Sequence, residues 1–186
     1  MGKLIYSMIV SLDGYVADDS GNFDWAEPDA SLHSFINDLE RSVGTYLYGR
    51  RMYEVMSWWE SVGDTNDIRP HIQDFAKLWC AADKVIYSAT LAAVSTASTR
   101  IEREFDTAAV AKMRAESERD ISIGGPTLAT AAIAAGLVDE YQLYIAPVIV
   151  GSGLRAFLGG ARQDLELLGE RRFESGFVYL NYGLRR

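Results

Sequence analysis

The stretch of sequence that decides the fold is residues 123–151, which read IGGPTLATAAIAAGLVDEYQLYIAPVIVG. Its Gly-Gly-Pro turn follows a short strand predicted over Asp120–Ile123 and opens an alanine-rich helix predicted over Thr127–Ala135. A glycine ends that helix, and the next segment, Tyr141–Val150, is the most apolar strand predicted in the chain. The order strand, helix, strand is typical of a sheet with helices packed on its faces.

The same alternation continues on both sides of this stretch. Upstream, predicted strands and helices take turns, and residues 89–100 are ambiguous because they combine small residues with threonines. Downstream, two alternating segments are typical of an antiparallel hairpin that closes the sheet. The sequence therefore predicts one three-layer α/β domain over residues 1–186. The other strands are predicted at residues 3–10, Thr45–Gly49 and Lys84–Ser88; the other helices at a segment that begins after Asp29, Arg50–Trp59, Arg69–Asp83 and Phe105–Glu118; and the hairpin strands at Leu165–Phe173 and Gly176–Leu184.

Composition excludes several classes of protein. The 186 residues include 18 Lys and Arg against 26 Asp and Glu, a net charge of −8, which argues against a surface for nucleic acid. One cysteine, Cys80, cannot form a disulfide within the chain and indicates a reducing compartment. No run approaches the ~20 apolar residues that cross a bilayer, and His33 and His71 have no partners at metal-ligand spacing. We therefore expect a cytoplasmic protein without a membrane segment or a metal site.

Two strand–glycine–helix corners are the best candidates for chemistry. One turns at Gly49 within YLYGRRMYEVM, and the other turns at the Gly-Gly-Pro described above. Glycine at such a corner allows backbone N–H groups at a helix N-terminus to approach a phosphate. Arg50 and Arg51 lie in the first turn of the helix after Gly49, where cations oppose the helix dipole, so a bound anion would explain their position. Neither corner matches the dinucleotide or P-loop fingerprint, and tight turns without a ligand are the alternative.

The loop from residue 13 to Asp29 is a third candidate. It leaves a predicted strand and is long enough to fold over a ligand as a lid, although its opening Asp-Gly is also a common hairpin signal. Asp29 suits either a helix N-cap or a carboxyl group that lines a pocket. Ser88 suits a turn or a phosphate contact, and Trp58 and Trp59 suit the core or the wall of a cleft.

Together these pieces resemble the dihydrofolate reductase-like superfamily, and more closely its bacterial branch related to the C-terminal reductase domain of the riboflavin-biosynthesis protein RibD. The similarity runs in order along essentially the whole chain. It implies a central mixed, mostly parallel sheet of about eight strands that binds NADPH across the carboxyl ends of its strands. The segments that match are Ser11–Ala17, Leu47–Tyr53, Lys84–Ser88, Ile123–Leu128 and Ala146–Gly151.

The resemblance also implies roles for individual residues. Ile9 and Val16 would face the nicotinamide ring. Gly49, Arg50 and Arg51 would lie by the pyrophosphate and the adenosine 2′-phosphate, because an arginine fork suits a phosphate. Ser88 would lie near the 2′-phosphate. The residues expected to line the pyrophosphate from the second corner are Gly124, Gly125, Pro126, Thr127 and Leu128.

Departures from the family patterns bear on the substrate. Trp25 and Asp29 stand about where a Trp…Pro segment precedes the pterin-binding carboxylate of dihydrofolate reductases. Ala146 replaces the threonine that partners this carboxylate, which disfavours dihydrofolate because a pterin would be left with unpaired polar groups. The Thr-Val-x-x-Asp-x-Pro continuation of the riboflavin-type domain is also absent.

We therefore hypothesise an NADPH-dependent reductase that transfers hydride to a small heterocyclic or ribosylaminopyrimidine-like substrate, with Asp29 supplying or orienting a proton. Trp25, Trp58 and Trp59 would line the substrate cleft. A homodimer is expected because riboflavin-type relatives pair, with Tyr141–Val150 and the C-terminal strands as contact surfaces. The alternatives are an NADPH sensor without turnover, a scaffold that has lost its ligand, and a true dihydrofolate reductase.

Overall fold

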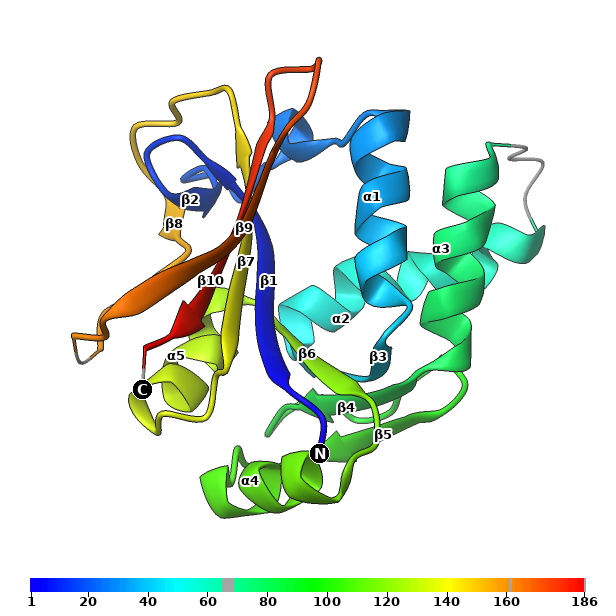
Figure 1. Ribbon diagram of the computed structural model, residues 1–186. Helices are drawn as coiled ribbons and strands as arrows, with labels where there is room; N and C mark the ends of the chain where they lie inside the picture. The colour runs from blue at the N-terminus through cyan, green and yellow to red at the C-terminus, as the bar shows by residue number, and fades with distance from the viewer. Residues whose placement is uncertain (65–68, 161, 186) are drawn as a thin grey trace.

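An eight-stranded sheet forms the centre of the computed structural model, which describes residues 1–64, 69–160 and 162–185. The strands are ordered β5-β4-β3-β6-β1-β7-β10-β9, and each neighbouring pair is parallel except the two that contain β10. This confirms the mixed, mostly parallel sheet with a closing antiparallel hairpin (Figure 1). The strands are β1 (Leu4–Ser11), β3 (Val43–Gly49), β4 (Asp83–Tyr87), β5 (Thr99–Glu102), β6 (Asp120–Gly124), β7 (Glu140–Ala146), β9 (Leu165–Arg172) and β10 (Val178–Leu184), while β2 (Tyr15–Ala17) and β8 (Leu154–Arg155) form a separate pair.

Helices cover both faces of the sheet and complete the three layers (Figure 1). The alternation along β3 shows how, because Tyr46 and Tyr48 join the core beneath α2 and α3, whereas Leu47 joins the core beneath α4 and α5. No helix in the described ranges has the length and apolar character needed to span a bilayer. The helices are α1 (Ala30–Glu40), α2 (Arg50–Met56), α3 (Pro70–Ala81), α4 (Thr107–Glu116) and α5 (Pro126–Ala134), with the 3-10 helices η1 (Asp24–Ala26) and η2 (Ser57–Asp64).

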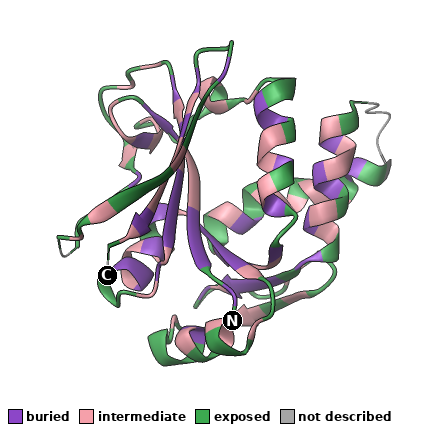
Figure 2. Ribbon diagram, viewed as in Figure 1, coloured by how far each residue is buried: buried purple, intermediate pink, exposed green. Residues whose placement is uncertain are grey.

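Burial is concentrated in the central strands. Figure 2 shows β1, β6 and β7 largely buried, whereas the edge strand β9 is largely exposed. Side chains of β1 and β6, such as Tyr6 and Ile123, are fully buried against the layer of α4 and α5. The exposed edge of β9 follows from its position, since it pairs with β10 alone.

Several boundaries differ from the prediction for local reasons. The strand predicted over Tyr141–Val150 ends at Ala146, because Pro147 has no N–H to donate to a ladder. The helix predicted over Arg50–Trp59 is α-helical only to Met56 and continues as η2. The ambiguous residues 89–100 contain the start of β5, and β2 and β8 are too short to produce an alternating pattern.

The helices that follow two neighbouring strands pack on opposite faces of the sheet. β3 and β6 lie next to each other, but α2, which follows β3, packs on one face of the sheet and α5, which follows β6, packs on the other. In open α/β sheets, a ligand-binding crevice forms outside the carboxyl ends of two such strands. The fold therefore directs attention to Gly49 and Gly124, which are the last residues of β3 and β6.

Candidate nucleotide site

The two glycine corners lie side by side at the carboxyl end of the sheet. Tyr48 is paired with Gly124 across β3 and β6, and Gly49 is paired with Tyr87 across β3 and β4. Ser88 directly follows Tyr87. The structure thus brings together Ser88, Gly49 and Gly124, which the sequence separates widely.

Both glycines of the second corner are required by geometry. A Cβ atom at Gly124 would lie 2.9 Å from Cε1 of Tyr48 and 3.1 Å from Cε of Met52, which is closer than carbon atoms normally pack. Gly125 has a φ of +92°, a conformation that residues with a side chain rarely adopt. The absent side chains let the end of β6 and the turn into α5 lie directly against Tyr48 of β3 and Met52 of α2.

The N-terminus of α5 has backbone N–H groups that no intrahelical hydrogen bond uses. Gly125 is the N-cap residue, and no described side chain caps the helix. Pro126 has no N–H, and the first intrahelical bond runs from the Ala129 N–H to the Gly125 carbonyl at 3.0 Å. The amides of Thr127 and Leu128 therefore remain for an anion, which the helix dipole also favours.

The two arginines of α2 are exposed but differ in their partners. Arg50 Nε donates to Glu54 Oε1 at 2.7 Å, and its Nη1 lies 3.4 Å from Thr90 Oγ1. Arg51 forms no hydrogen bond or ion pair with any residue in the described part of the chain. Glu54 therefore offsets part of the charge of Arg50, while the charge of Arg51 is left for a ligand.

Ser88 closes a turn at the end of β4. Its Oγ accepts hydrogen bonds from the N–H groups of Thr90 at 3.3 Å and Leu91 at 3.0 Å. Because both bonds use the oxygen as an acceptor, the hydroxyl proton is still available to a ligand. The turn interpretation of Ser88 is confirmed, and it is compatible with a phosphate contact.

Arg103 is a neighbour of this turn that sequence reasoning missed. Its Nη1 donates to the Ser88 carbonyl at 3.0 Å and to the Leu91 carbonyl at 2.7 Å. The residue stands in a run of mixed charge between Arg100 and Arg119, which is typical of a solvated surface and gives no signal of its own. Only the pairing of β5 with β4 places it here.

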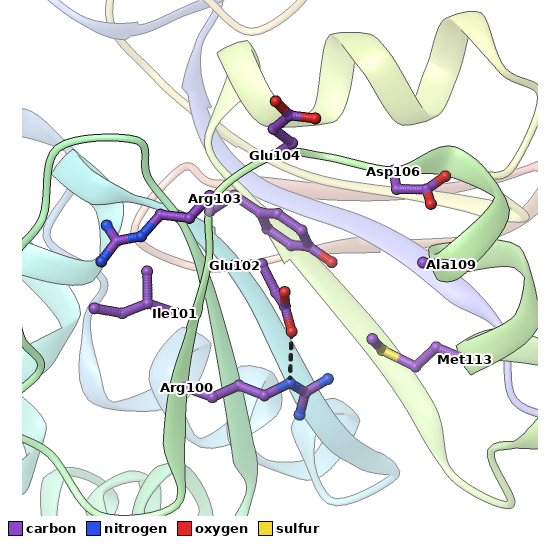
Figure 3. A pocket seen from close by; sticks show the side chains of 9 residues that line it. Arg100, Ile101, Glu102, Arg103, Glu104, Asp106, Ala109 and Met113 are labelled. Atoms are coloured by element: carbon purple, nitrogen blue, oxygen red, sulfur yellow. Dashed lines mark hydrogen bonds and ion pairs between the residues drawn. The ribbon is translucent and has the colours of Figure 1, made fainter.

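A cavity of about 490 Å³ opens between β5 and α4 on one side of Arg103 (Figure 3). Tyr87 and Met113 contribute apolar surface to it, whereas Glu102, Glu104 and Asp106 contribute carboxylates. These carboxylates would repel a phosphate. The phosphate-binding part of the edge is therefore expected on the other side, toward α2.

The loop after β1 is fastened to the loop after β7. Asp13 accepts hydrogen bonds from the N–H groups of Val150 at 3.1 Å and Gly151 at 2.7 Å, and from the Ser11 hydroxyl at 2.7 Å. The Ser11 hydroxyl and these amides lower the pKa of Asp13 to about 2. The hairpin interpretation of the Asp-Gly turn is wrong, because β2 pairs with β8 and not with β1. The turn instead joins two loops at the carboxyl end of the sheet.

An aromatic cluster beneath α1 holds Trp25 together with Ile9 of β1. The indole Nε1 of Trp25 is buried and lacks a hydrogen-bond partner among the described residues, and so does the hydroxyl of Tyr144 in the same cluster. A buried donor without a partner costs about 1–3 kcal/mol. A ligand that supplies an acceptor would recover this cost. Val16, which was predicted with Ile9 to face the nicotinamide, is half-buried on β2.

Asp29 is the N-cap of α1. Its Oδ1 accepts a hydrogen bond from the Leu32 N–H at 2.8 Å, which confirms the capping interpretation. This backbone bond, together with the Ser175 hydroxyl, holds the pKa of Asp29 below its usual value. A carboxylate with a lowered pKa is a weak proton donor at neutral pH. The catalytic role of Asp29 stays a prediction.

Trp58 and Trp59 lie away from Trp25. Trp59 packs between α1 and α3, with its ring centroid 4.6 Å from that of Phe75 and 5.8 Å from that of His33. Trp58 is exposed and contacts Trp59 edge-on. The structure therefore does not bring the three tryptophans together in one cluster.

A buried carboxyl group, that of Glu40, lies at the end of α1. Glu40 is 7% exposed and accepts a hydrogen bond from the Tyr46 hydroxyl at 2.9 Å. Burial raises its pKa to about 7, against the lowering effect of the Tyr46 bond. Sequence reasoning missed it, because a glutamate near a helix end is ordinarily solvated.

Comparisons with known proteins identify the family and agree with the fold. The model of the RibD C-terminal domain family matches residues 2–179. YyaP of Bacillus subtilis (strain 168), described as an uncharacterized protein, is 29% identical over 184 residues, which are 97% of this chain and 94% of YyaP. A Shewanella sp. PV-4 protein assigned to riboflavin biosynthesis has a TM-score of 0.76 at 18% identity, with both chains fully covered. RibD of Acinetobacter baumannii has a TM-score of 0.72 at 16% identity, and this chain spans 59% of it. At such identities the solved structures establish the fold.

Proposed function

The chain belongs to the RibD C-terminal domain family, and from that premise we propose that it is an NADPH-dependent reductase. The observation that carries the proposal is the meeting of the two glycine corners at the ends of β3 and β6. One corner offers backbone donors and the other offers arginines, which is the combination that a phosphorylated dinucleotide requires.

The residues present fit NADPH. The amides of Thr127 and Leu128 would hold the pyrophosphate, and the close approach permitted by Gly124 keeps the cradle clear of side chains. Arg51 and Ser88 offer donors to the adenosine 2′-phosphate. A 2′-phosphate would also account for the arginines at the dipole end of α2 that disfavours cations.

The cofactor supplies the hydride, and the protein supplies position and protection from water. Ile9 and Val16 would face the nicotinamide from β1 and β2. Asp13 fastens the loop after β1 to the loop after β7, and the fastened loop would act as a lid that keeps water from the reacting atoms.

The substrate is proposed to be a small heterocyclic or ribosylaminopyrimidine-like compound with a reducible C=N or C=O bond. Trp25 supports this class, because its buried Nε1–H needs an acceptor such as a ring carbonyl oxygen. Asp29 would orient the substrate from the start of α1, whose Leu32 belongs to the same cluster, and its capping bond holds its pKa below the usual value. Ala146, buried at the end of β7, offers no hydrogen bond to a pterin.

The test is oxidation of NADPH, followed by its absorbance with a panel of pterins, aminopyrimidine ribosides and simple carbonyl compounds. We expect turnover with at least one aminopyrimidine or carbonyl compound and faster oxidation of NADPH than of NADH. Tight binding of NADPH without turnover on any compound would favour a sensor. A melting temperature that NADPH leaves unchanged would contradict the proposal, since ligand at 100 Kd adds about 2.7 kcal/mol of stability.

We also propose that two copies pair through the edge of β9. The predicted contact at Tyr141–Val150 stays a prediction, and both edges of its strand portion, β7, are already paired with β1 and β10. β9 instead offers an unpaired edge with Leu167 and Leu168, each about half exposed. Sedimentation of the chain and of Leu167→Glu tests this: a dimer that the variant converts to monomer is expected.

A further inference from the structure

Arg103 is held in place by neutral backbone carbonyl groups and not by a carboxylate. Nη1 donates to the carbonyl oxygens of Ser88 and Leu91, at 3.0 and 2.7 Å, and both acceptors are neutral. Glu102 and Glu104 flank it in sequence, yet neither forms an ion pair with it in the part of the chain that the structure describes. The guanidinium is thus positioned by the backbone and keeps a full positive charge for a ligand.

The free edge of this guanidinium suits an anion with two oxygens. Its Nε and Nη2 form no hydrogen bond to any described residue, so three N–H donors remain in one plane. Nε and Nη2 together present a fork that matches two phosphate oxygens. Figure 3 shows the Arg103 side chain directed away from Glu102, Glu104 and Asp106, so the fork does not face the carboxylates of the cavity.

A second arginine, Arg50 of α2, approaches the turn after β4 that Arg103 holds. Within this turn, Arg50 approaches Thr90. The Ser88 hydroxyl of that turn keeps its proton for a ligand, as described above. Two guanidinium groups and one hydroxyl donor therefore meet at the ends of β3, β4 and β5.

We propose that Arg103 determines the preference of this site for a nucleotide with a 2′-phosphate. It would bind the phosphate through Nε and Nη2 and position the Ser88 hydroxyl by holding the carbonyls of the turn. This inference rests on the proposed function. It assigns to Arg103 part of the discrimination between nucleotides with and without a 2′-phosphate, which would otherwise depend on Arg50 and Arg51 alone. The charge of Arg50 is already partly offset by Glu54.

The experiment uses two probes that differ only in the phosphate concerned, adenosine 2′,5′-bisphosphate and AMP. Calorimetry measures the affinity of each for the full chain, for Arg103→Ala and for Arg103→Lys. The control is Lys112→Ala, which removes one positive charge from the exposed surface of α4. We expect Arg103→Ala to weaken the bisphosphate about 10- to 100-fold and AMP less than about 3-fold. Arg103→Lys should recover only part of the loss, because an ammonium has no planar fork.

The outcomes separate the two proposals. If the unaltered chain prefers the bisphosphate and Arg103→Ala keeps that preference, the inference is wrong and the proposed function stands. If Arg103→Ala weakens both compounds equally, Arg103 supports the fold and not the 2′-phosphate. If the unaltered chain binds neither compound nor NADPH, the proposed function fails, and this inference fails with it. The ratio of the two affinities within one variant is insensitive to partial misfolding, and it therefore remains decisive.

Discussion

The nucleotide edge and the face beneath α1 differ in the kinds of group that form them. The nucleotide edge, at the ends of β3, β4 and β6 with the first turns of α2 and α5, consists of glycines, uncapped amides and exposed arginines. The face beneath α1 consists of buried aromatic rings and polar groups that water does not reach, including Glu40, Tyr144 and Trp25. Under the proposed function, the cofactor would need only the first kind of surface, because phosphates are bound by backbone donors and positive charge. In the same proposal, substrate choice would depend on the second kind, where a single unpaired group costs as much as an entire surface ion pair.

The largest effect expected from this contrast is the pH dependence of Glu40→Gln. Burial raises the folded-state pKa of Glu40 to about 7, above its unfolded value. Because the pKa of this acid is raised on folding, the free energy of unfolding of the wild-type protein is highest below the unfolded-state pKa. It falls as the pH rises from there through about 7. Glutamine keeps an acceptor for Tyr46 and has no charge to bury. The variant should therefore exceed the wild-type free energy of unfolding by about 3 kcal/mol at pH 8 and by clearly less at pH 5.5.

Urea unfolding at the two pH values measures this difference. Glu118→Gln, on the exposed surface, is the control and should show no such trend. A difference that is equal at both pH values would mean that Glu40 is not a buried proton-binding group, and the contrast between the two regions would weaken.

The next effect concerns the fit of the corners at the nucleotide edge. Gly124→Ala places a Cβ against the buried ring of Tyr48 and should destabilise the fold by about 2 kcal/mol. Gly49→Ala is the matched control, because its Cβ would meet no atom within 4 Å and its φ of −75° suits alanine. Thermal unfolding compares the two. Equal destabilisation would show that the corner at Gly124 is too loosely packed to require glycine.

The sequence predicts the nucleotide edge well, because its signals are local. Glycine, proline and arginine at the start of a helix act on backbone conformation within a few residues, so Gly49 and the segment 124–128 can be read from the chain alone. Their adjacency follows from the strand order, and it was expected only from the family resemblance, which assigns both corners to one cofactor. Arg103 escaped notice, because its role arises from the pairing of β5 with β4.

The face beneath α1 was much less predictable. The burial of Glu40 depends on how α1 packs on the sheet, and the packing of Trp59 against Phe75 depends on the contact of α1 with α3. Neither is a property of a sequence window. A helix cap such as Asp29 could be predicted because capping is local, whereas its catalytic role would need knowledge of what lies opposite it.

A smaller effect separates the two arginines of α2. Arg51→Ala should weaken NADPH about 10-fold, whereas Arg50→Ala should weaken it about 3-fold because Glu54 already offsets the charge of Arg50. The affinity for NADH should change little in either variant. Fluorescence titration of both nucleotides measures the four affinities. Glu54→Gln is a further test, since it should strengthen NADPH binding slightly by releasing Arg50.

The smallest effect on stability is expected at Asp29, which caps the helix above the buried aromatic face. Asp29→Ala removes the N-cap of α1 and should cost about 1 kcal/mol, whereas Asp29→Asn keeps an oxygen for the Leu32 N–H and should cost only a few tenths. Steady-state rates of NADPH oxidation then separate the cap from a chemical role. If the carboxylate orients the substrate, Asp29→Asn will lose activity while Tm stays near the wild-type value. If both variants lose activity only in proportion to their stability, Asp29 acts through the helix it caps. Under the proposed function, the buried Nε1–H of Trp25, which lacks a hydrogen-bond partner among the described residues, would then be the next group to test for orienting the substrate.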